Sequence, residues 1–317
     1  MGKIIKLLRM LIILITVLSI NGCINTSSAW HQIVPQTNII FQSVMWNPYE
    51  LNFIQADGSN HQVLNLDVNF IKPVWSSDGA IIYGLSNPVT QPPYEFIGYP
   101  AYWKIKNHIF KRCDKNLPYY GQIEEYKHTT TKNEVILYNA YEIVIFDMDA
   151  CQVKSTLVDF NNPSGVYMIS GFSYFPQTQE IVYGRLTVEN KSRKYSLRKM
   201  NLKTGEETEL AEGINPAWSP DGKQIAFLGL DGLYVIQADG QQSQKLINRQ
   251  FFDPYSISGP SLRNPQPYWS PDGQWLIYHQ CIDTACDYRQ TSIYKVRVSD
   301  GEETKIYTGG KFPSWQP

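Results

Sequence analysis

The histidines are the first residues to weigh, because a metal site or a general acid–base centre would commonly use them. A zinc or manganese site needs several ligands that converge on one ion, and acid–base catalysis needs an imidazole beside a second reactive group. In this chain of 317 residues the histidines are scattered singly, and no Gly-x-Ser-x-Gly elbow, His-Glu-x-x-His pair, phosphate-binding glycine loop or Cys-x-x-Cys pair occurs. We therefore expect no catalytic residue, no metal and no cofactor. We interpret all of these histidines as packing or surface residues; they are His31, His61, His108, His128 and His279.

The carboxylates give a similar result. Asp147 and Asp149 flank one methionine and could suggest calcium. Calcium takes about six to eight oxygen ligands, of which two carboxylates supply too few. The pair stands where a turn between two strands is expected, so we predict a turn.

The elements that would position any site are set by a repeat. Trp-Ser-Pro-Asp-Gly occurs at residues 218–222 and 269–273, and Trp-Ser-Ser-Asp-Gly occurs at 75–79. A proline stands two residues before each tryptophan, and β-branched and aromatic residues follow each glycine. Proline presets one backbone angle, aspartate bonds its own backbone, and glycine permits a positive φ. Each copy therefore predicts two strands joined by a tight turn, with the aspartate as a turn residue.

A second repeated phrase lies further along each unit. It consists of alternating residues that end in Asp-Gly, Thr-Gly or a looser turn, and it occurs at 51–58, 144–150, 197–205, 233–240 and 293–301. Such alternation predicts a third strand and a turn, followed by a short fourth strand such as 244–246. Four strands in each unit predict the blade of a β-propeller.

The aromatic residue before each first turn serves as an anchor for counting blades. The anchors are Trp75, Tyr126, Tyr174, Trp218, Trp269 and Trp315. Their spacings are close to the roughly 40 to 50 residues of a four-stranded blade, so we predict six blades. Residues 312–317 supply a first strand and residues 38–66 supply later strands, so the two ends are expected to complete one blade. The alternative is an unclosed stack of repeats, which would leave strand edges unpaired.

The Trp-Ser-Pro-Asp-Gly hairpins resemble the repeat of TolB-type β-propellers over most of residues 38–317. The resemblance implies an all-β, six-bladed propeller of four-stranded antiparallel blades. TolB-type proteins are periplasmic, work in the Tol-Pal envelope system, and carry a small α/β domain ahead of the propeller. Here only about 15 residues, 23–37, separate a targeting segment from the first strand. The resemblance therefore implies the fold and an exported location rather than a Tol-specific role.

Residues 1–22 have the pattern of an export signal. Lys3, Lys6 and Arg9 precede an apolar run that is short for a membrane span. The run ends in Ile20-Asn21-Gly22-Cys23, which is similar to a bacterial lipobox, although Asn21 departs from the usual small residue. We expect cleavage after residue 22, lipidation of Cys23 and a tether at 23–37. An ordinary signal peptide and an uncleaved anchor remain alternatives.

The remaining cysteines are even in number, as an oxidising compartment favours. Cys281 and Cys286 lie in one loop and could pair across its base. Cys113 and Cys151 lie near outer strands of neighbouring blades and could also pair. Free buried thiols are the alternative for both pairs.

Long segments are expected on the face opposite the Asp-Gly turns. They cover residues 87–100, 161–171, 187–194, 251–265 and 281–289. Loops on a rigid scaffold often carry function, and Tyr, Trp and Arg are frequent interface anchors. We predict that this face and the channel mouth that it surrounds bind a partner protein or peptide; the alternative is that the aromatic residues cap the core. The candidate contacts are Tyr94, Phe96, Tyr99, Phe252, Tyr255, Arg263 and Tyr288.

Together these patterns predict a monomeric protein-interaction module of the cell envelope, held at a bacterial membrane by lipid and facing the periplasm or the cell exterior. With 28 basic and 29 acidic residues, the charge balance gives no reason to expect nucleic-acid binding. A second hypothesis is an enzyme or a small-ligand or polysaccharide binder that uses the central channel, similar to a lyase or a lactonase. A third is a structural envelope component.

Overall fold

The computed structural model describes twelve segments of the chain. They are residues 38–43, 50–66, 68–86, 99–107, 109–113, 125–128, 133–138, 142–159, 167–189, 192–252, 265–281 and 291–317. Within these segments no helix is both long and apolar enough to cross a membrane.

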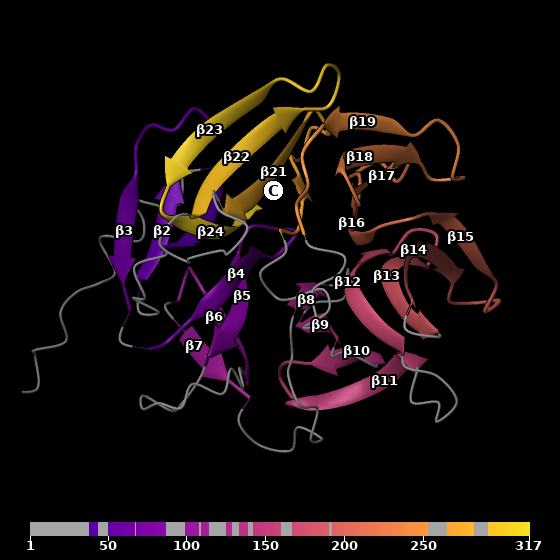
Figure 1. Cartoon of the computed structure of the whole chain (residues 1–317). Helices are drawn as coiled ribbons and strands as arrows, with labels where there is room; N and C mark the ends of the chain where they lie inside the picture. The colour runs from indigo at the N-terminus through magenta and orange to yellow at the C-terminus, as the bar shows by residue number, and fades with distance from the viewer. Residues whose placement is uncertain are drawn as a thin grey trace, which may run out of the picture. The chain divides into compact units, whose positions relative to one another are not determined.

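The described residues form six antiparallel sheets of four strands, which we number as blades (Figure 1). Blade one contains β24 (Gly310–Trp315), β1 (Ile39–Ser43), β2 (Glu50–Ile54) and β3 (Gln62–Asn65). Blade two contains β4 (Ile71–Trp75), β5 (Ile81–Ser86), β6 (Tyr99–Lys104) and β7 (Ile109–Arg112). Blade three contains β8 (Glu125–His128), β9 (Glu134–Tyr138), β10 (Glu142–Asp147) and β11 (Gln152–Asp159).

The second half of the chain repeats this order. Blade four contains β12 (Tyr167–Phe175), β13 (Glu180–Glu189), β14 (Ser192–Asn201) and β15 (Glu207–Ala211). Blade five contains β16 (Ile214–Trp218), β17 (Gln224–Gly229), β18 (Gly232–Gln237) and β19 (Gln244–Ile247). Blade six contains β20 (Tyr268–Trp269), β21 (Trp275–Cys281), β22 (Thr291–Arg297) and β23 (Glu303–Thr308). All six anchors lie in first strands, so the six-bladed fold predicted from the sequence is confirmed.

Blade one is closed by the two ends of the chain, as the sequence predicts. β24 pairs antiparallel with β1, with Ile39 opposite Trp315 and Ser43 opposite Gly310. In Figure 1 the yellow strand β24 accordingly lies close to the indigo strand β2, and β1 stands between them in the sheet. This pairing gives β1 a hydrogen-bonded neighbour on each side, which removes a sheet edge from the ring.

The Asp-Gly turns have the predicted chemistry. At the turn of blade five, Asp221 Oδ1 accepts hydrogen bonds from Ser219 Oγ at 2.7 Å and from Lys223 N at 3.1 Å. The Gly222 N–H donates to the carbonyl of Ser219 at 3.0 Å, and Gly222 adopts a φ of 70°. The corresponding turns of blades two and six repeat these contacts. The aspartates are therefore occupied as turn residues.

The first strands are the inner strands of the propeller, and they hold adjacent blades together. Trp269 Nε1 donates to the carbonyl of Ala217 in blade five at 2.9 Å, and Trp315 Nε1 donates to the carbonyl of Tyr268 in blade six at 3.2 Å. Buried apolar side chains fill the space between sheets, as in the cluster that joins blades four, five and six. Burial of such area at about 25 cal/mol per Å² is the main source of stability.

One predicted loop is mostly strand. The segment 187–194 of blade four lies in β13 and β14, where Thr187 pairs with Lys194 and Glu189 pairs with Ser192. The β-branched residues Thr187 and Val188 favour the extended conformation. The loop prediction was wrong at this position, since the hairpin continues to residues 189 and 192.

Candidate functional site

One position of the repeat has an unusual backbone. It lies three residues before the anchor, and we call its occupants the inner-strand residues: Lys72, Gly171, Asn215, Gln266 and Phe312. Four of them have a positive φ, of 53° for Lys72, 78° for Gly171, 52° for Asn215 and 51° for Phe312. The pairing of each of these inner strands with the second strand shifts register at this point, as at a β-bulge.

This backbone is costly for residues other than glycine. A left-handed conformation is disfavoured by about 1–2 kcal/mol for each residue that carries a Cβ. Such residues persist where their surroundings hold them, and they are frequent at binding sites. The repeated outlier therefore directs attention to what these side chains contact.

At this end of blades one, two and six, two lysine side chains and a histidine lie beside one aromatic ring. The Nζ atoms of Lys72 and Lys311 each lie 5.5 Å from the ring centroid of Phe312. The ring of His279, from β21, lies edge-on to Phe312 at 5.0 Å between centroids. The backbone N–H of Phe312 donates to His279 Nδ1 at 3.4 Å, so the imidazole helps to fix the strained residue.

Burial and like charge shift the protonation of this cluster. Burial lowers the pKa of His279 to about 3, and the charges of Lys311 and Lys72 add to the effect. Burial also lowers the pKa of Lys311 to about 8, with a further contribution from Lys72. His279 is therefore neutral at physiological pH, and the sequence-based interpretation of it as a packing residue agrees with its 3% exposure.

In blades four, five and six the same repeat position brings together two amides and a glycine. Asn215 Nδ2 donates to the carbonyl of Pro265 at 2.9 Å, and Gln266 Nε2 donates to the carbonyl of Pro216 at 2.7 Å. These reciprocal bonds join blades five and six. A Cβ on Gly171 would lie 2.7 Å from Asn215 Oδ1 and 3.0 Å from Gln266 Oε1, so glycine is required there.

Two buried oxygen atoms near these residues make no hydrogen bond. They are the carbonyl oxygen Oε1 of Gln266, whose side chain is 7% exposed, and the hydroxyl Oγ of Ser170, which is 5% exposed. A buried polar atom without a partner costs stability, and the described residues hold further such atoms elsewhere, including Trp75 Nε1 and Trp218 Nε1 of the anchors.

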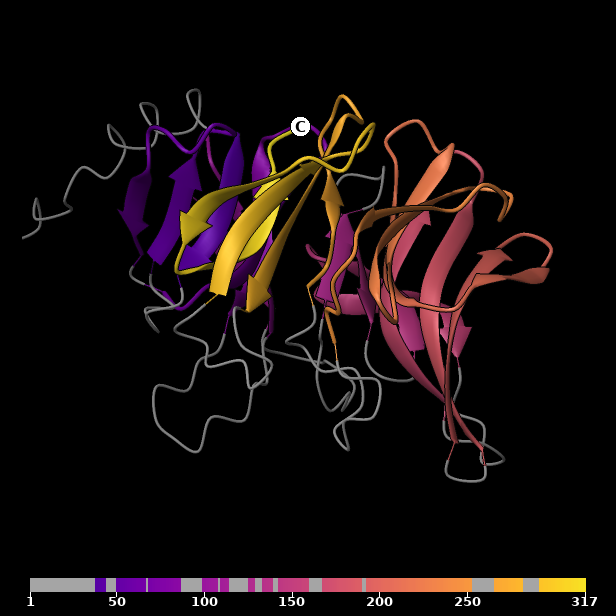
Figure 2. The same cartoon turned by 45° about the horizontal axis from the view of Figure 1, so that its top comes forward.

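These residues lie at the end of the blades opposite the Asp-Gly turns. Lys72, Asn215 and Phe312 stand in the first half of their inner strands, Gln266 precedes β20 and Gly171 is in the middle of β12; in each blade the turn follows the anchor, which lies three residues later. A Cβ on Gly79, in the turn of blade two, would lie 3.8 Å from Pro317, so the C-terminus that Figure 2 marks lies close to this turn. The inner-strand residues thus share the end from which the loops between second and third strands depart.

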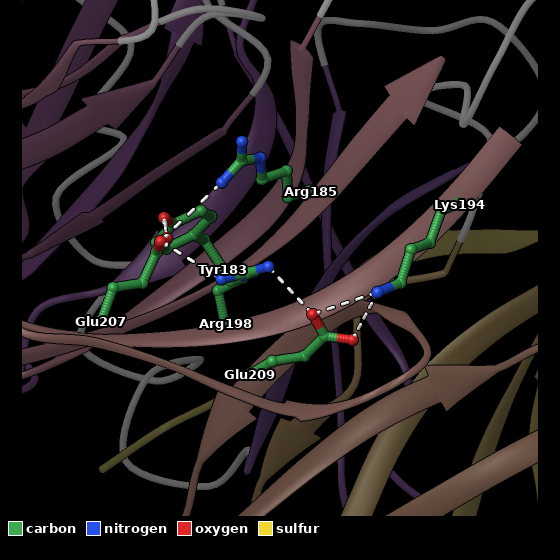
Figure 3. Close-up of polar contacts among 6 residues, drawn as sticks. All are labelled: Tyr183, Arg185, Lys194, Arg198, Glu207 and Glu209. Carbon is green, nitrogen blue, oxygen red and sulfur yellow. Dashed lines mark hydrogen bonds and ion pairs between the residues drawn. The ribbon is translucent and has the colours of Figure 1, made fainter. Parts of the chain in front are cut away.

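A second charged cluster, on the outer strands of blade four, has mutually satisfied charges (Figure 3). Glu207 accepts a hydrogen bond from Tyr183 Oη, and its Oε2 lies 3.3 Å from Arg198 Nη1. Glu209 lies 2.9 Å from both Arg198 Nη2 and Lys194 Nζ. A similar arrangement joins Tyr278 and Glu303 of blade six to Arg249, which follows β19 of blade five. Because the charges contact one another in both places, we interpret these clusters as stabilising networks.

The structure locates two of the predicted partner contacts. Tyr99 begins β6, opposite Ser86, and is partly exposed. Phe252 is 6% exposed and packs against Tyr195 with 5.4 Å between ring centroids. The ring of Phe252 is thus part of the core cluster of blades four, five and six, as the capping alternative describes, and its contact with a partner stays a prediction. Outside the described residues lie Tyr94, Phe96, Tyr255, Arg263 and Tyr288.

The cysteines give one clear result. Cys113, which follows β7, and Cys151, which precedes β11, form a disulfide with 5.2 Å between Cα atoms. It joins blades two and three, as one of the two predicted pairings. Cys281 ends β21, while Cys286 and Cys23 lie outside the described residues, so their roles remain predictions.

The acidic pair of blade three is a turn, as predicted. Asp147 Oδ1 accepts hydrogen bonds from the backbone N–H groups of Asp149 and Ala150, each at 2.8 Å. Among the described residues, no group of three or more His, Cys, Asp or Glu side chains is placed to hold a metal ion.

Reasoning from the sequence missed Lys72, Lys311, Asn215 and Gln266. A signal did exist, because a non-apolar residue stands directly before the proline of three repeats, at Lys72, Asn215 and Gln266. The pattern indicates strands and turns, but it does not show the left-handed backbone of Lys72 and Asn215.

Comparison with known proteins supports the fold. No family model matches the chain. Its sequence is similar to the uncharacterized peptidase YuxL of Bacillus subtilis (strain 168), with 25% identity over 132 residues, which is 38% of this chain and 18% of that protein. The chain thus matches less than a fifth of the length of that relative.

Two solved structures are similar over most of the chain. The crystal structure of TolB from Acinetobacter baumannii gives a TM-score of 0.61 at 14% identity, covering 89% of this chain and 67% of that one. A chain of the nidogen/laminin complex gives a TM-score of 0.61 at 10% identity, covering 89% of this chain and 98% of that one. At these identities the likeness shows a shared propeller fold.

Proposed function

We propose that the protein is an exported, membrane-tethered propeller that binds a protein or peptide at the end of the blades where the inner-strand residues lie. The observation that carries the proposal is the backbone and charge of the inner strands at this end. Lys72, Asn215 and Phe312 adopt a positive φ there, and the Nζ atoms of Lys72 and Lys311 each lie 5.5 Å from the ring centroid of Phe312. Strained residues on a rigid scaffold are frequent at binding sites.

Three further observations support an extracytoplasmic binding role. The Cys113–Cys151 disulfide is typical of proteins that fold in an oxidising compartment. The lipobox-like sequence that ends in Cys23 follows a signal-like segment. Two propellers of similar fold are a TolB protein and a component of the nidogen/laminin complex.

Crosslinking in intact cells, followed by affinity recovery, tests the binding role. The wild-type protein is expected to recover a reproducible partner, and recovery of no reproducible partner contradicts the proposal. A variant with Tyr94, Phe96 and Tyr255 replaced by alanine separates binding from capping. Lost recovery at unchanged thermal stability indicates contact by these rings, while unchanged recovery with lost stability indicates capping.

The tether is tested separately with Cys23→Ser. The wild-type protein is expected in the detergent phase after phase separation, and the variant in the aqueous phase or as an uncleaved precursor. Equal partitioning and equal mass of the two mature proteins would show that Cys23 carries no lipid.

A further inference from the structure

The hairpin formed by β6 and β7 of blade two carries an excess of positive charge beside an exposed apolar side chain. Residues 99–113 contain four lysine and arginine residues and no aspartate or glutamate. Ile109, which begins β7, is 45% exposed, and it is one of three large apolar side chains that the described part of the chain leaves exposed. It pairs with Lys104 across the hairpin, and exposed Lys106 lies in the turn between them. An apolar side chain flanked by lysines is typical of surfaces that contact a membrane.

The two lysines nearest the turn have no carboxylate partner. Lys104 Nζ lies 5.1 Å from the ring centroid of Tyr102, and neither Lys104 nor Lys106 forms an ion pair with any residue of the described segments. The carboxylates of the adjacent turns have other contacts: Asp149 accepts a hydrogen bond from Tyr102 Oη at 3.3 Å, and Asp78 accepts hydrogen bonds within its own turn. Even counted against the hairpin, these two carboxylates leave its four cations in excess, so this surface attracts anions.

Packing holds the hairpin in place on the blade. The ring of Phe110 lies 6.0 Å from the ring of Trp103 and 6.1 Å from that of buried Phe70, measured between centroids. Cys113, which follows β7, is joined to blade three by the disulfide. Because the backbone is fixed in this way, binding through the hairpin orders little more than the side chains that make the contact.

The turn of this hairpin lies at the end of the blades where the Asp-Gly turns are, which we call the turn end. The N–H of Ile105 donates at 3.1 Å to the carbonyl of Ala80, which follows the Asp-Gly turn of blade two. Residue 38 lies at the same end, because the N–H of Gln316, just after the anchor of blade one, donates to the carbonyl of Asn38 at 2.7 Å. The segment that precedes residue 38 therefore joins the propeller at the end that carries the lysines.

The predicted tether brings a bilayer within reach of this end. Residues 23–37 span at most roughly 50 Å when fully extended. A lipid on Cys23 would therefore hold the propeller near the membrane surface at a high effective concentration, at which weak contacts with that surface are populated.

We propose that Lys104, Lys106 and Ile109 dock the turn end of blade two on a bilayer of anionic phospholipid. The ammonium groups lie beside lipid phosphates, and the isoleucine enters the boundary between headgroups and acyl chains. The inference rests on the proposed function, in which a lipid tethers the protein to a membrane. It adds an orientation, because the end of the blades that is proposed to bind a partner then faces away from the bilayer.

Lysine footprinting of the full-length protein tests the contact. The protein is placed on vesicles of phosphatidylcholine alone or with about 30% phosphatidylglycerol, and mass spectrometry measures how fast a membrane-impermeant reagent acetylates each lysine. Lys104 and Lys106 are expected to react at least about fivefold more slowly on the anionic vesicles, and high salt is expected to restore their rates. Lys203 and Lys223, which are exposed in turns of blades four and five, are expected to react equally on both kinds of vesicle.

Vesicle sedimentation of the released propeller measures the same contact without the lipid. Residues 37–317 form a compact unit that contains all six sheets, so cleavage at a protease site placed within residues 24–36 releases the folded propeller. Lys104→Gln/Lys106→Gln is expected to weaken partitioning onto anionic vesicles about thirtyfold, and Ile109→Ser about tenfold.

Two matched variants serve as controls. Lys104→Arg/Lys106→Arg, which keeps both charges, is expected to bind as the wild-type propeller does. Lys203→Gln/Lys223→Gln removes two exposed charges from the same end of other blades and is also expected to bind normally. Circular dichroism and thermal melts verify that each variant is folded.

Several results would overturn the inference. Equal reaction rates of Lys104 and Lys106 on the two kinds of vesicle would reject the docking contact, while leaving the tether to the Cys23→Ser experiment and the binding role to crosslinking. Failure of the released propeller to bind anionic vesicles, or equal losses in the two double glutamine variants, would also reject it. Binding to polygalacturonate in place of vesicles, lost in Lys104→Gln/Lys106→Gln, would assign the surface to an acidic glycan. A dimer that Ile109→Ser dissociates, without vesicle binding, would assign it to a second copy of the chain.

Discussion

The buried imidazole of His279 makes the stability of the propeller depend on pH in a defined window. Its pKa is lowered to about 3 in the folded protein by burial and by Lys311 and Lys72, whereas an unfolded histidine titrates near 6.5. Between these two values the unfolded chain binds one more proton than the folded chain. The free energy of unfolding is therefore highest above pH 6.5 and decreases as the pH falls toward 3.

The magnitude follows from the two pKa values. Near pH 5 the linkage relation gives a loss of about 2 kcal/mol relative to pH 7.5, with a limiting slope of about 1.4 kcal/mol for each pH unit. His279→Asn removes the titration while keeping a polar atom near the N–H of Phe312. The substitution itself also lowers stability, but it does so equally at both pH values. This cost therefore cancels when the stability of one protein at pH 5.0 is compared with the stability of the same protein at pH 7.5.

Urea unfolding at pH 7.5 and pH 5.0 measures this difference. The wild-type protein is expected to lose about 2 kcal/mol more than His279→Asn over the interval. His61→Asn serves as the control: burial also lowers the pKa of His61, but this residue is exposed, so a smaller effect is expected. If wild type and His279→Asn lose the same stability, His279 titrates normally in the folded protein and the reasoning from its burial is refuted.

Three further predictions concern the scaffold and are measured by urea unfolding. Gly222→Ala is expected to lower the free energy of unfolding by at least about 2 kcal/mol, because φ is 70° and the new Cβ would lie 2.2 Å from a phenylalanine ring. The control is Gly205→Ala, where φ is 71° but no atom lies within 4 Å of the new Cβ, and it should cost only about 1 kcal/mol. Equal costs for the two variants would contradict the packing argument. Glu207→Ala is expected to cost about 3 kcal/mol, since it removes a carboxylate that contacts Tyr183, Arg185 and Arg198, and Glu209→Ala less than about 1 kcal/mol; the reverse order would contradict the assignment. The disulfide between blades two and three closes a loop of 38 residues, so replacing both of its cysteines by alanine should lower the free energy of unfolding by about 4 kcal/mol under oxidising conditions. In reductant, the difference in stability between this variant and the wild-type protein should vanish.

The repeat made the fold predictable because its information is local. Proline, aspartate and glycine define a turn within five residues, and alternating side chains define the strands around it. The asymmetry of the two chain ends was also visible, so the pairing of β24 with β1 could be predicted without any knowledge of packing. One of the two suggested disulfides could be named because both cysteines lie near outer strands of adjacent blades.

The candidate site was much less predictable. The aromatic residues of the long segments suggested surface contacts, yet Phe252 fits between Tyr195 and the neighbouring sheet, and only the packing of three blades decides this. Conversely, Lys72 and Lys311 are 239 residues apart in the chain and carry no common motif. Their proximity to one ring depends on ring closure and on two left-handed residues.

The sequence by itself determined the strands, the turns, the number of blades and the way in which the chain closes, because each follows from residues adjacent in the chain or from a repeating period. The tertiary structure alone decided which side chains meet at the ends of the inner strands. The reason is physical: charge repulsion, burial and unpaired oxygen atoms are properties of distances between blades, and only the closed ring sets those distances.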